Sequence, residues 1–370
     1  MDFNYSEEQD ALRESIASLL DSYYGDVTKR NAVSETEEGW DAKAWQAIAE
    51  LGALGLPFSE EDGGFGASAV EVAIVMEEVG RTLTPEPLLD AVYLPGKLIE
   101  RAGSAEQRKK FLEALSEGGL LLAFAHEEAG SRWPQIKVNT KATGSGTYKI
   151  SGTKLPVAAG DSAETLVVSA KKDDGTLGLF LVDANASGVT RKVYKTFDER
   201  RGAEIVFDNV DAELLGDGSN AEQAIAEGYI AAQAAQCAEA VGVMREALKL
   251  TVEYLKTRKQ FGVPLATFQA LVHRASDMYA SLELANSLAL LANVSVGDGV
   301  YDPIVASRAK LQVGKAAKQI GQEAVQMHGG IGITYEAPIS HYHARLTAIN
   351  HTLGTPDDHL RVLADAVTLD

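Results

Sequence analysis

One stretch of the chain combines a permanent cation, an amide and an aromatic ring. It runs over Tyr254–Pro264, YLKTRKQFGVP, and contains Arg258, Gln260 and Phe261. A guanidinium is a planar fork of donors that suits a pyrophosphate. A glutamine amide can pair with a phosphate, a ribose or a base edge without adding charge, and a phenyl ring can pack on a flat heterocycle. These residue types predict a site for a dinucleotide.

A second stretch is rich in glycine. It runs over Gln326–Thr334, QMHGGIGIT, where Gly329 and Gly330 would let the backbone approach a ligand closely because no Cβ intrudes. The amides of Gln326 and of Gln269, which lies between the two stretches, suit a nucleotide equally. Such a glycine run alone is typical of a turn, and because it follows a helical pattern it is not a strand–helix dinucleotide fingerprint.

A third stretch lies nearer the N-terminus and runs from Leu54–Pro57, LGLP, through Glu61–Gly66, EDGGFG. In this order and at these separations, the three stretches resemble the acyl-CoA dehydrogenase family over essentially the whole chain. The resemblance implies that the matching positions form the adenosine and pyrophosphate part of a FAD site, and that they reach the FAD of a neighbouring subunit. These positions are Arg258, Gln260, Phe261, Gln269, Gln326, Gly329, Gly330, Gly354 and Thr355.

The resemblance also implies a reaction and its catalytic base. In the family, FAD takes a hydride from the β-carbon of an acyl-CoA thioester while a glutamate removes the α-proton. That glutamate commonly precedes a Gly-Thr pair, where this chain has Leu353, or lies on the helix before the Arg-Lys-x-Phe-Gly pattern, where it has Ala232. Neither side chain accepts a proton. Glu239, two helical turns beyond Ala232, is a candidate substitute base, and the alternative for it is a helix-packing ion pair.

The segments that hold the flavin ring in the family are altered as well. The first runs over His126–Arg132, HEEAGSR, and is one residue shorter than the family pattern. In the second, Pro156 replaces a tryptophan and Ala158 a threonine, so that an aromatic surface and a hydroxyl are both missing. The family's acyl-CoA-contacting arginine corresponds to Gln233, which can donate a hydrogen bond but carries no positive charge.

This pattern resembles the small or β-type subunits of bacterial two-component acyl-CoA dehydrogenases, such as the pimeloyl-CoA dehydrogenase small subunit and the partner subunits of steroid side-chain enzymes. The resemblance implies FAD-linked α,β-dehydrogenation of an acyl-CoA in fatty acid or steroid degradation. This chain would be the non-catalytic partner that completes FAD sites of a catalytic subunit in an α2β2 heterotetramer. The alternative is an active homotetrameric FAD-dependent enzyme with a relocated carboxylate base.

The secondary-structure elements that would position these residues come in three groups along the chain: helices, then strands, then helices again. Helical periods fill the first third, beginning at a capping box of Ser6 and Gln9. From about residue 119, six short β-prone runs with no helix between them predict an antiparallel barrel or sandwich. Helical periods return over about 221–257, 266–295 and 303–328. The resemblance implies the acyl-CoA dehydrogenase fold: an N-terminal α-helical domain (1–118), a middle antiparallel β-barrel (119–215) and a C-terminal four-helix bundle for oligomerisation (216–370).

The composition limits the kinds of partner and the cellular compartment that we expect. With 53 acidic and 34 basic residues, the formal net charge of −19 argues against nucleic acid or an anionic membrane as a partner. The chain lacks an apolar run long enough to span a bilayer, and its acidic start is unlike a secretory signal. Its one cysteine, Cys237, suits a reducing compartment, so we expect the cytoplasm. The histidines lack metal-ligand spacing, so we expect no metal site.

Overall fold

The computed structural model describes residues 5–368 and divides the chain into two compact units. The helical unit consists of Met1–Asn31, Ala69–Thr84 and Gln233–Asp370. The sheet unit consists of Ala32–Ser68 and Pro85–Ala232. The long helix α7 (Ala221–Thr257) contributes residues to both units. The domain boundaries expected at residues 118 and 215 stay a prediction.

The helical unit is built from helices, and the first of them begins at a clear local signal. Besides α7, its helices are α1 (Glu7–Tyr24), α4 (Ala69–Thr82), α8 (Gln269–Gly297), α9 (Pro303–His328), α10 (Pro338–Ile349) and α11 (Pro356–Thr368), and α2 (Val27–Ser34) contributes residues to both units. The predicted capping box is confirmed, because the backbone N–H of Gln9 donates to Ser6 Oγ and the backbone N–H of Ser6 donates to Gln9 Oε1. The predicted helices 221–257 and 303–328 are confirmed at both ends. α8 starts three residues later than predicted, because Leu265–Thr267 form a 3₁₀ turn (η4) before it.

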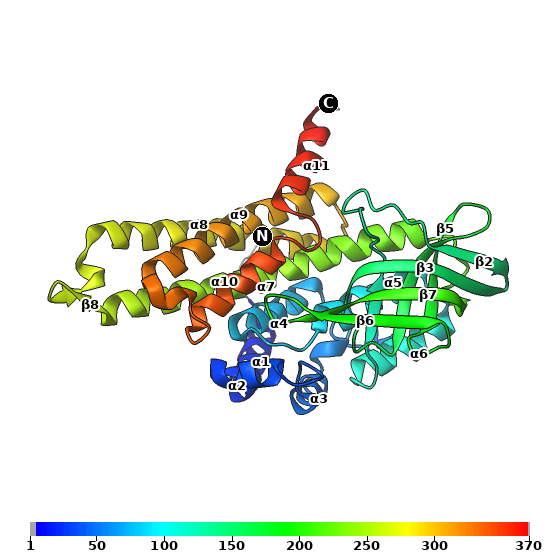
Figure 1. The fold of residues 1–370 in the computed structure, drawn as a ribbon, viewed down its shortest axis with the longest axis horizontal. Coiled ribbons are helices and arrows are strands. Elements are labelled where there is room, and N and C mark those ends of the chain that lie inside the picture. The colour runs from blue at the N-terminus through cyan, green and yellow to red at the C-terminus, as the bar shows by residue number, and fades with distance from the viewer. Residues whose placement is uncertain (1–4, 369–370) are drawn as a thin grey trace. The chain divides into compact units, whose positions relative to one another are not determined.

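Within residues 5–368, α8, α10 and α11 each pack on α9. α8 lies along one side of it, as Figure 1 shows, and α10 and α11 contact it elsewhere. The buried Asn293 of α8 donates from Nδ2 to the Ala234 carbonyl at 3.0 Å, and this bond joins α8 to α7. The region after residue 233 is therefore a helical domain in which α7, α8, α9 and α10 lie against one another.

α4 and α7 cross at two glycines. A Cβ added to Gly80 would lie 2.0 Å from the Glu239 carbonyl oxygen, and a Cβ added to Gly242 would lie 1.9 Å from the Glu77 carbonyl oxygen. Both distances are far inside van der Waals contact, so only glycine permits this approach of the two backbones. The crossing fixes the rotation of α7 beside Glu239.

The sheet unit combines short helices with one mixed sheet. Its helices are α3 (Ala42–Glu50), α5 (Leu94–Ala102) and α6 (Ala105–Ser116), with the short turns η1 (Ala53–Gly55), η2 (Glu60–Asp62) and η3 (Leu88–Tyr93). Its strands are β1 (Leu122–Ala125), β2 (Lys141–Ser145), β3 (Thr147–Ala158), β4 (Thr165–Lys171), β5 (Leu177–Asp183), β6 (Val189–Lys195) and β7 (Arg201–Leu214). The six β-prone runs predicted from the sequence form strands, and β2 is an additional one.

The order of the sheet is β1-β4-β2-β3-β7-β5, with β6 on β7. The expectation of a purely antiparallel sheet is wrong, because β1 pairs with β4 in parallel from Leu122–Thr165 to Ala125–Val168. The β2–β3 hairpin lies between these strands in sequence and gives the chain the length that a parallel return needs. β4 also pairs with β5, but β2 meets β4 through a single residue pair, so the sheet is strongly curved rather than a clear barrel.

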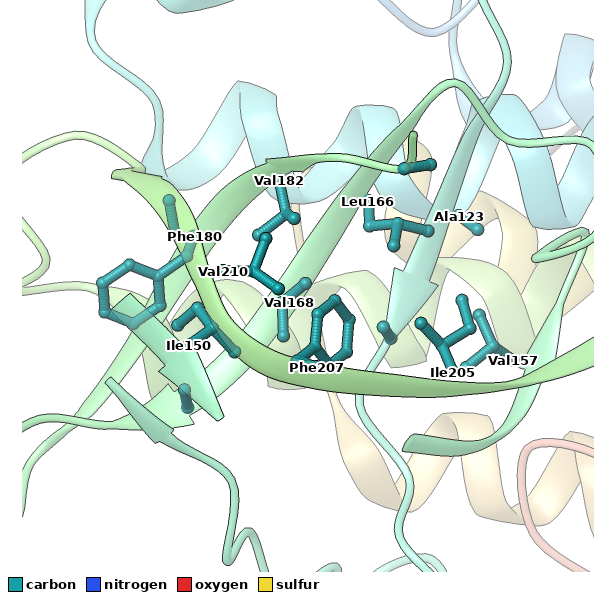
Figure 2. Packing of buried hydrophobic residues seen from close by; sticks show 14 of the residues in the cluster. Ala123, Ile150, Val157, Leu166, Val168, Phe180, Val182, Ile205, Phe207 and Val210 are labelled. Carbon is teal, nitrogen blue, oxygen red and sulfur yellow. The ribbon is translucent and has the colours of Figure 1, made fainter. Parts of the chain in front are cut away.

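Alternate residues of the strands fill the core of the sheet unit. Figure 2 shows Leu166 and Val168 of β4 pointing the same way, towards Ile205 and Phe207 of β7. This spacing of two follows from the pleat, which sends successive side chains to opposite faces. β1 of this sheet ends at Ala125, so the sheet positions the segment that begins at His126. Within residues 5–368, no helix is long and apolar enough to cross a membrane.

Candidate functional site

The two stretches that predict a dinucleotide site come together within the helical unit. α7 ends at Thr257, and a hairpin of β8 (Lys259–Gln260) and β9 (Val263–Pro264) follows it, as Figure 1 shows. α9 ends at His328 and is followed by η5 (Gly329–Ile333). The Tyr254 and His328 rings stack with their centroids 4.5 Å apart and their planes at 24°. This stack ties the end of α7 to the end of α9, so residues distant in sequence share one end of the unit, here called the helix-end cluster.

Most predicted cofactor residues of the helix-end cluster are solvent-exposed. They are Arg258, Gln260, Phe261, Gln269, Gln326, Gly329 and Gly330. In the part of the chain that the structure describes, the Arg258 guanidinium makes no ion pair or hydrogen bond. Phe261 is 91% exposed and has a left-handed φ of 55°. A cation without a counter-charge and a phenyl ring held out of the core are both available to a ligand from outside this chain.

The glycines of the cluster leave open backbone. Gly329 has a φ of 70°, which favours glycine at the end of α9. A Cβ added to Gly330 would meet nothing within 4 Å, so no packing inside this chain requires a glycine there. The residues present therefore fit the adenosine and pyrophosphate part of a FAD, which needs a cation, amides and close backbone approach.

The remaining two predicted cofactor residues lie elsewhere in the helical unit, in the turn Thr352–Thr355 between α10 and α11. Leu353 has a left-handed φ of 55° and Gly354 a φ of 95°. The Thr355 hydroxyl accepts from the Asp358 N–H at 3.3 Å and so caps the start of α11, and it donates to Asp358 Oδ2 at 2.6 Å. Within residues 5–368, the peptide N–H groups of Leu353 and Gly354 donate to no other group. The turn therefore presents two unengaged donors in succession.

Side chains from three helices hold this turn. The Leu353 carbonyl accepts from Gln233 Nε2 at 3.0 Å and lies 3.1 Å from His359 Nε2. The Thr352 hydroxyl accepts from Gln236 Nε2 at 2.7 Å. Burial, and then the charge of Lys310, lower the pKa of His359 to about 4, so this ring is neutral at physiological pH. Gln233, which the sequence predicted to stand where the family has an acyl-CoA arginine, thus donates to the turn itself.

Lys310 of α9 completes the set and is buried. Its Nζ donates to Gln236 Oε1 at 2.6 Å, to the Ile349 carbonyl at 3.2 Å and to the Thr352 carbonyl at 2.9 Å. Burial lowers the pKa of this amine to about 8. The sequence interpretation missed Lys310 and Gln236. A signal was present, since Lys310 lies on the same apolar stripe of α9 as the buried Ala306 and Val313.

The three positions considered for a catalytic base are all accounted for. Leu353 lies in the turn and Ala232 is buried, and neither carries an ionisable group. Glu239 is buried on α7 and accepts from Arg345 of α10 at both oxygens, from Nε to Oε1 and from Nη2 to Oε2, each at 2.8 Å. A bidentate pair of this kind fixes a carboxylate in one orientation. The geometry supports the helix-packing alternative for Glu239.

In the sheet unit, the segment after β1 makes a closed polar network. Lys154 is fully buried, and its Nζ donates to the His126 carbonyl at 2.9 Å, to Glu128 Oε1 at 2.9 Å and to Ser169 Oγ at 3.1 Å. His126 Nδ1 lies 2.7 Å from Ser169 Oγ, and its ring stacks on Phe124 with centroids 5.0 Å apart. Burial, and then Lys154, lower the pKa of His126 to about 3. This imidazole is neutral and engaged within its own chain.

The rest of the predicted ring segment offers few groups to a flavin. Pro156 of β3 has no N–H, and Ala158 has no hydroxyl. Glu128 accepts from the Thr140 N–H and hydroxyl as well as from Lys154; burial raises the pKa of its carboxyl, but these bonds outweigh burial and lower it to about 2. The ring-contacting half of a FAD site therefore does not match the residues present, in contrast to the helix-end cluster.

Comparison with known proteins identifies the class and then the family. The chain matches the family model described as "Acyl-CoA dehydrogenase, N-terminal domain" over residues 6–119 and that described as "Acyl-CoA dehydrogenase, C-terminal domain" over 227–368. The fold is thus that of the FAD-linked acyl-CoA oxidoreductases. The chain is 31% identical over 361 residues to acyl-CoA dehydrogenase IpdE2 of Mycolicibacterium smegmatis, which covers 97% of this chain and 98% of that protein. The chain belongs to the acyl-CoA dehydrogenase family.

Solved structures agree with this assignment. A variant of the steroid ACAD Tcur3481-Tcur3483 superposes with a TM-score of 0.89 at 31% identity and covers 98% of both chains. Butyryl-CoA dehydrogenase from Megasphaera elsdenii superposes with a TM-score of 0.91 at 26% identity over the whole of both chains.

Proposed function

We propose that this chain is the non-catalytic partner subunit of a two-component acyl-CoA dehydrogenase and completes FAD sites that belong to a catalytic subunit in an α2β2 heterotetramer. One observation carries the proposal: Arg258 of the helix-end cluster has no ion-pair partner within residues 5–368 and the backbone at Gly330 is open, while Leu353 and Ala232 stand at the two positions expected for a base. A half-site without a base suits a chain that holds a neighbour's cofactor.

The chemistry of the assembly is α,β-dehydrogenation of an acyl-CoA thioester. FAD, when bound, accepts the hydride from the β-carbon. Arg258, Gln260 and Gln326 would hold its pyrophosphate and adenosine, and Phe261 would pack on a ring of the cofactor. Gln269, Gly329, Gly330, Gly354 and Thr355 are proposed to line the same half-site. The α-proton would leave to a glutamate of the catalytic subunit, because Leu353 and Ala232 cannot accept it.

The architecture that we propose for this assembly is the one expected from the sequence. Residues 1–118 would form the N-terminal helical domain, 119–215 a barrel-like middle domain and 216–370 a four-helix bundle at the centre of the oligomer. The acyl chain would come from fatty acid or steroid degradation, in keeping with the steroid ACAD among the similar structures. We propose a cytoplasmic location, in line with the single cysteine.

The visible spectrum of the purified protein tests the proposal. The chain expressed alone is expected to carry well under one flavin per chain, and co-expression with an acyl-CoA dehydrogenase encoded beside it is expected to yield a yellow complex. Arg258→Gln in that complex should weaken FAD binding about tenfold or more, since a charge-assisted pair is lost. Lys256→Gln, an exposed cation two residues earlier, is the matched control and should change little.

The outcome that contradicts the proposal is equally clear. One tightly bound FAD per chain in the protein purified alone, with turnover of an acyl-CoA, would establish the active homotetramer instead. In that case a carboxylate outside the three base positions would have to be found by substitution of each Glu and Asp that faces the flavin.

A further inference from the structure

Lys310 is buried, and within residues 5–368 its ammonium forms no ion pair. In the described part of the chain, all three hydrogen-bond partners of its ammonium are neutral oxygens, on Gln236, Ile349 and Thr352. Glu239, a carboxylate whose charge acts on it, is already paired with the bidentate Arg345. Burial of an ammonium with no paired carboxylate is costly, and an apolar side chain of similar size is often the more stable choice. Stability alone does not explain a lysine here.

A second costly feature lies directly beside it. Leu353 is held at a φ of 55°, where a Cβ is crowded against the backbone and glycine is normally preferred. Such a conformation persists only where the surroundings over-determine it. Here Lys310 holds the preceding carbonyl of Thr352, while Gln233 and His359 hold the carbonyl of Leu353 itself. Two unfavourable features therefore converge on one turn.

We propose that Lys310 is a positioning residue, whose ammonium holds the turn Thr352–Thr355 in the conformation that presents Gly354 and Thr355 to FAD. The inference rests on the proposed function for the identity of the ligand, but the fixation of the turn is independent of it. The ammonium acts through geometry: its N–H groups reach Gln236 on α7, the Ile349 carbonyl at the end of α10 and the Thr352 carbonyl, so that the start of the turn is anchored to α7 and α9. The left-handed Leu353 and the unengaged N–H groups of Leu353 and Gly354 follow from this anchoring.

Amide hydrogen exchange on the purified chain tests the fixation without cofactor. In Lys310→Met, exchange of the two hydrogen-bonded N–H groups of the turn, those of Thr352 and Thr355, is expected to quicken at least tenfold, while exchange in the middle of α9 stays as in the wild type. Lys315→Met, an exposed lysine of the same helix, is the matched control and should leave the turn protected. Faster exchange throughout α9 and α10, or an unchanged turn, would overturn the proposal.

A second variant covers the case in which Lys310→Met fails to fold. Gln236→Met keeps the ammonium but removes one of its acceptors and the donor to the Thr352 hydroxyl. The same faster exchange confined to residues 352–355 is expected. No change in the turn would show that the network does not position it.

The ligand part of the inference uses the complex of this chain with its catalytic subunit. Lys310→Met in the complex is expected to weaken FAD binding at least tenfold, and Lys315→Met is expected to leave it unchanged. A wild-type complex that binds no FAD would defeat the proposed function, whereas equal FAD affinities of the wild type and Lys310→Met would defeat only the inference about Lys310.

A pH profile separates a positioning ammonium from a mere packing residue. The groups that act on Lys310 are Cys237 and Glu239 on α7, Arg345 on α10 and His359 on α11. With the pKa of the amine lowered to about 8, protection of the turn, corrected for intrinsic exchange, should fall between pH 7 and 9 in the wild type. The profile of Lys310→Met should be flat over this range. A wild-type profile without that step would contradict the role of the charge.

Discussion

At position 239, a carboxylate on the buried face of α7 could be either a catalytic base or half of a structural pair. Arg345 donates to both of its oxygens, so that the carboxylate is held in one orientation by a positive charge that stabilises its ionised form. Buried ion pairs contribute little net stability, but removal of one partner leaves the other charge buried and uncompensated. We therefore predict that substitution of Glu239 lowers the stability strongly and has no direct effect on catalysis.

Glu239→Gln is expected to lower the free energy of unfolding of the helical region by about 3–5 kcal/mol, because the Arg345 guanidinium loses its counter-charge. Urea denaturation followed by circular dichroism measures the loss. Glu253→Gln, on an exposed position of the same helix, is the control and should stay within about 0.5 kcal/mol of the wild type. Full stability combined with loss of turnover in the assembled enzyme would instead identify Glu239 as the base.

Leu353→Glu places a carboxylate at one of the two positions where the sequence predicts the family's base, but it changes nothing in the predicted flavin-ring segment. Pro156 and Ala158 still provide neither the aromatic surface nor the hydroxyl expected at these positions. We therefore expect the variant chain alone to remain unable to reduce FAD with an acyl-CoA. Anaerobic mixing with an acyl-CoA and observation of the flavin band measures this. Bleaching of a bound flavin would show that the base was the sole loss.

At the scale of elements, the crossing of α4 and α7 determines where the buried face of α7 points. Gly242→Ala would force a Cβ to 1.9 Å from the Glu77 carbonyl, which only a shift of one helix can relieve. We expect a loss of about 3 kcal/mol or more, at the upper end of overpacking effects, and a displaced Glu239–Arg345 pair. Thermal denaturation measures the loss.

Gly330→Ala is the matched control for the crossing and a test of the helix-end cluster. Its Cβ would face open space, so stability should change by less than about 0.5 kcal/mol. If a dinucleotide approaches the backbone there, FAD binding in the complex should nevertheless weaken. Equal losses of stability in Gly330→Ala and Gly242→Ala would show that the crossing has no special role.

At the scale of the whole molecule, two buried histidines couple folding to pH, one in each unit. The pKa is lowered to about 3 for His126 and to about 4 for His359, in both cases first by burial. A lowered pKa means that the unfolded chain binds more protons between pH 4 and 6.5, so stability is present above about pH 6.5 and is lost as the pH falls. Each histidine should cost about 2 kcal/mol between pH 7 and 5.

Urea titrations at pH 7 and pH 5 check this prediction. His359→Gln should show a smaller loss than the wild type for the unfolding of the helical unit, because that proton uptake is removed. His273→Gln, an exposed histidine on α8, should keep the wild-type loss. If His359→Gln and His273→Gln both keep the full wild-type loss of stability, the assignment of this pH dependence to His359 is wrong.

The local sequence was sufficient to predict the helices and strands that depend mainly on residues close together in the chain. The capping box at Ser6, the helices 221–257 and 303–328, and the alternating runs that became six strands were predicted because hydrophobic period, caps and turn residues act over a few neighbours. The family followed from three motifs and is confirmed by the similar proteins. The parallel pairing of β1 with β4 was not predicted, since no local pattern specifies which strand a short edge strand will join.

The sequence by itself determined which groups are present: an arginine, amides and glycines in the helix-end stretches, and leucine or alanine where a base is expected. Only the tertiary structure decided what those groups face. It placed Arg345 on Glu239, Gln233 on the Leu353 carbonyl and Lys310 under the same turn, through contacts between residues far apart in the chain. Such pairs depend on the packing of whole helices, which the order of residues in any one segment does not encode.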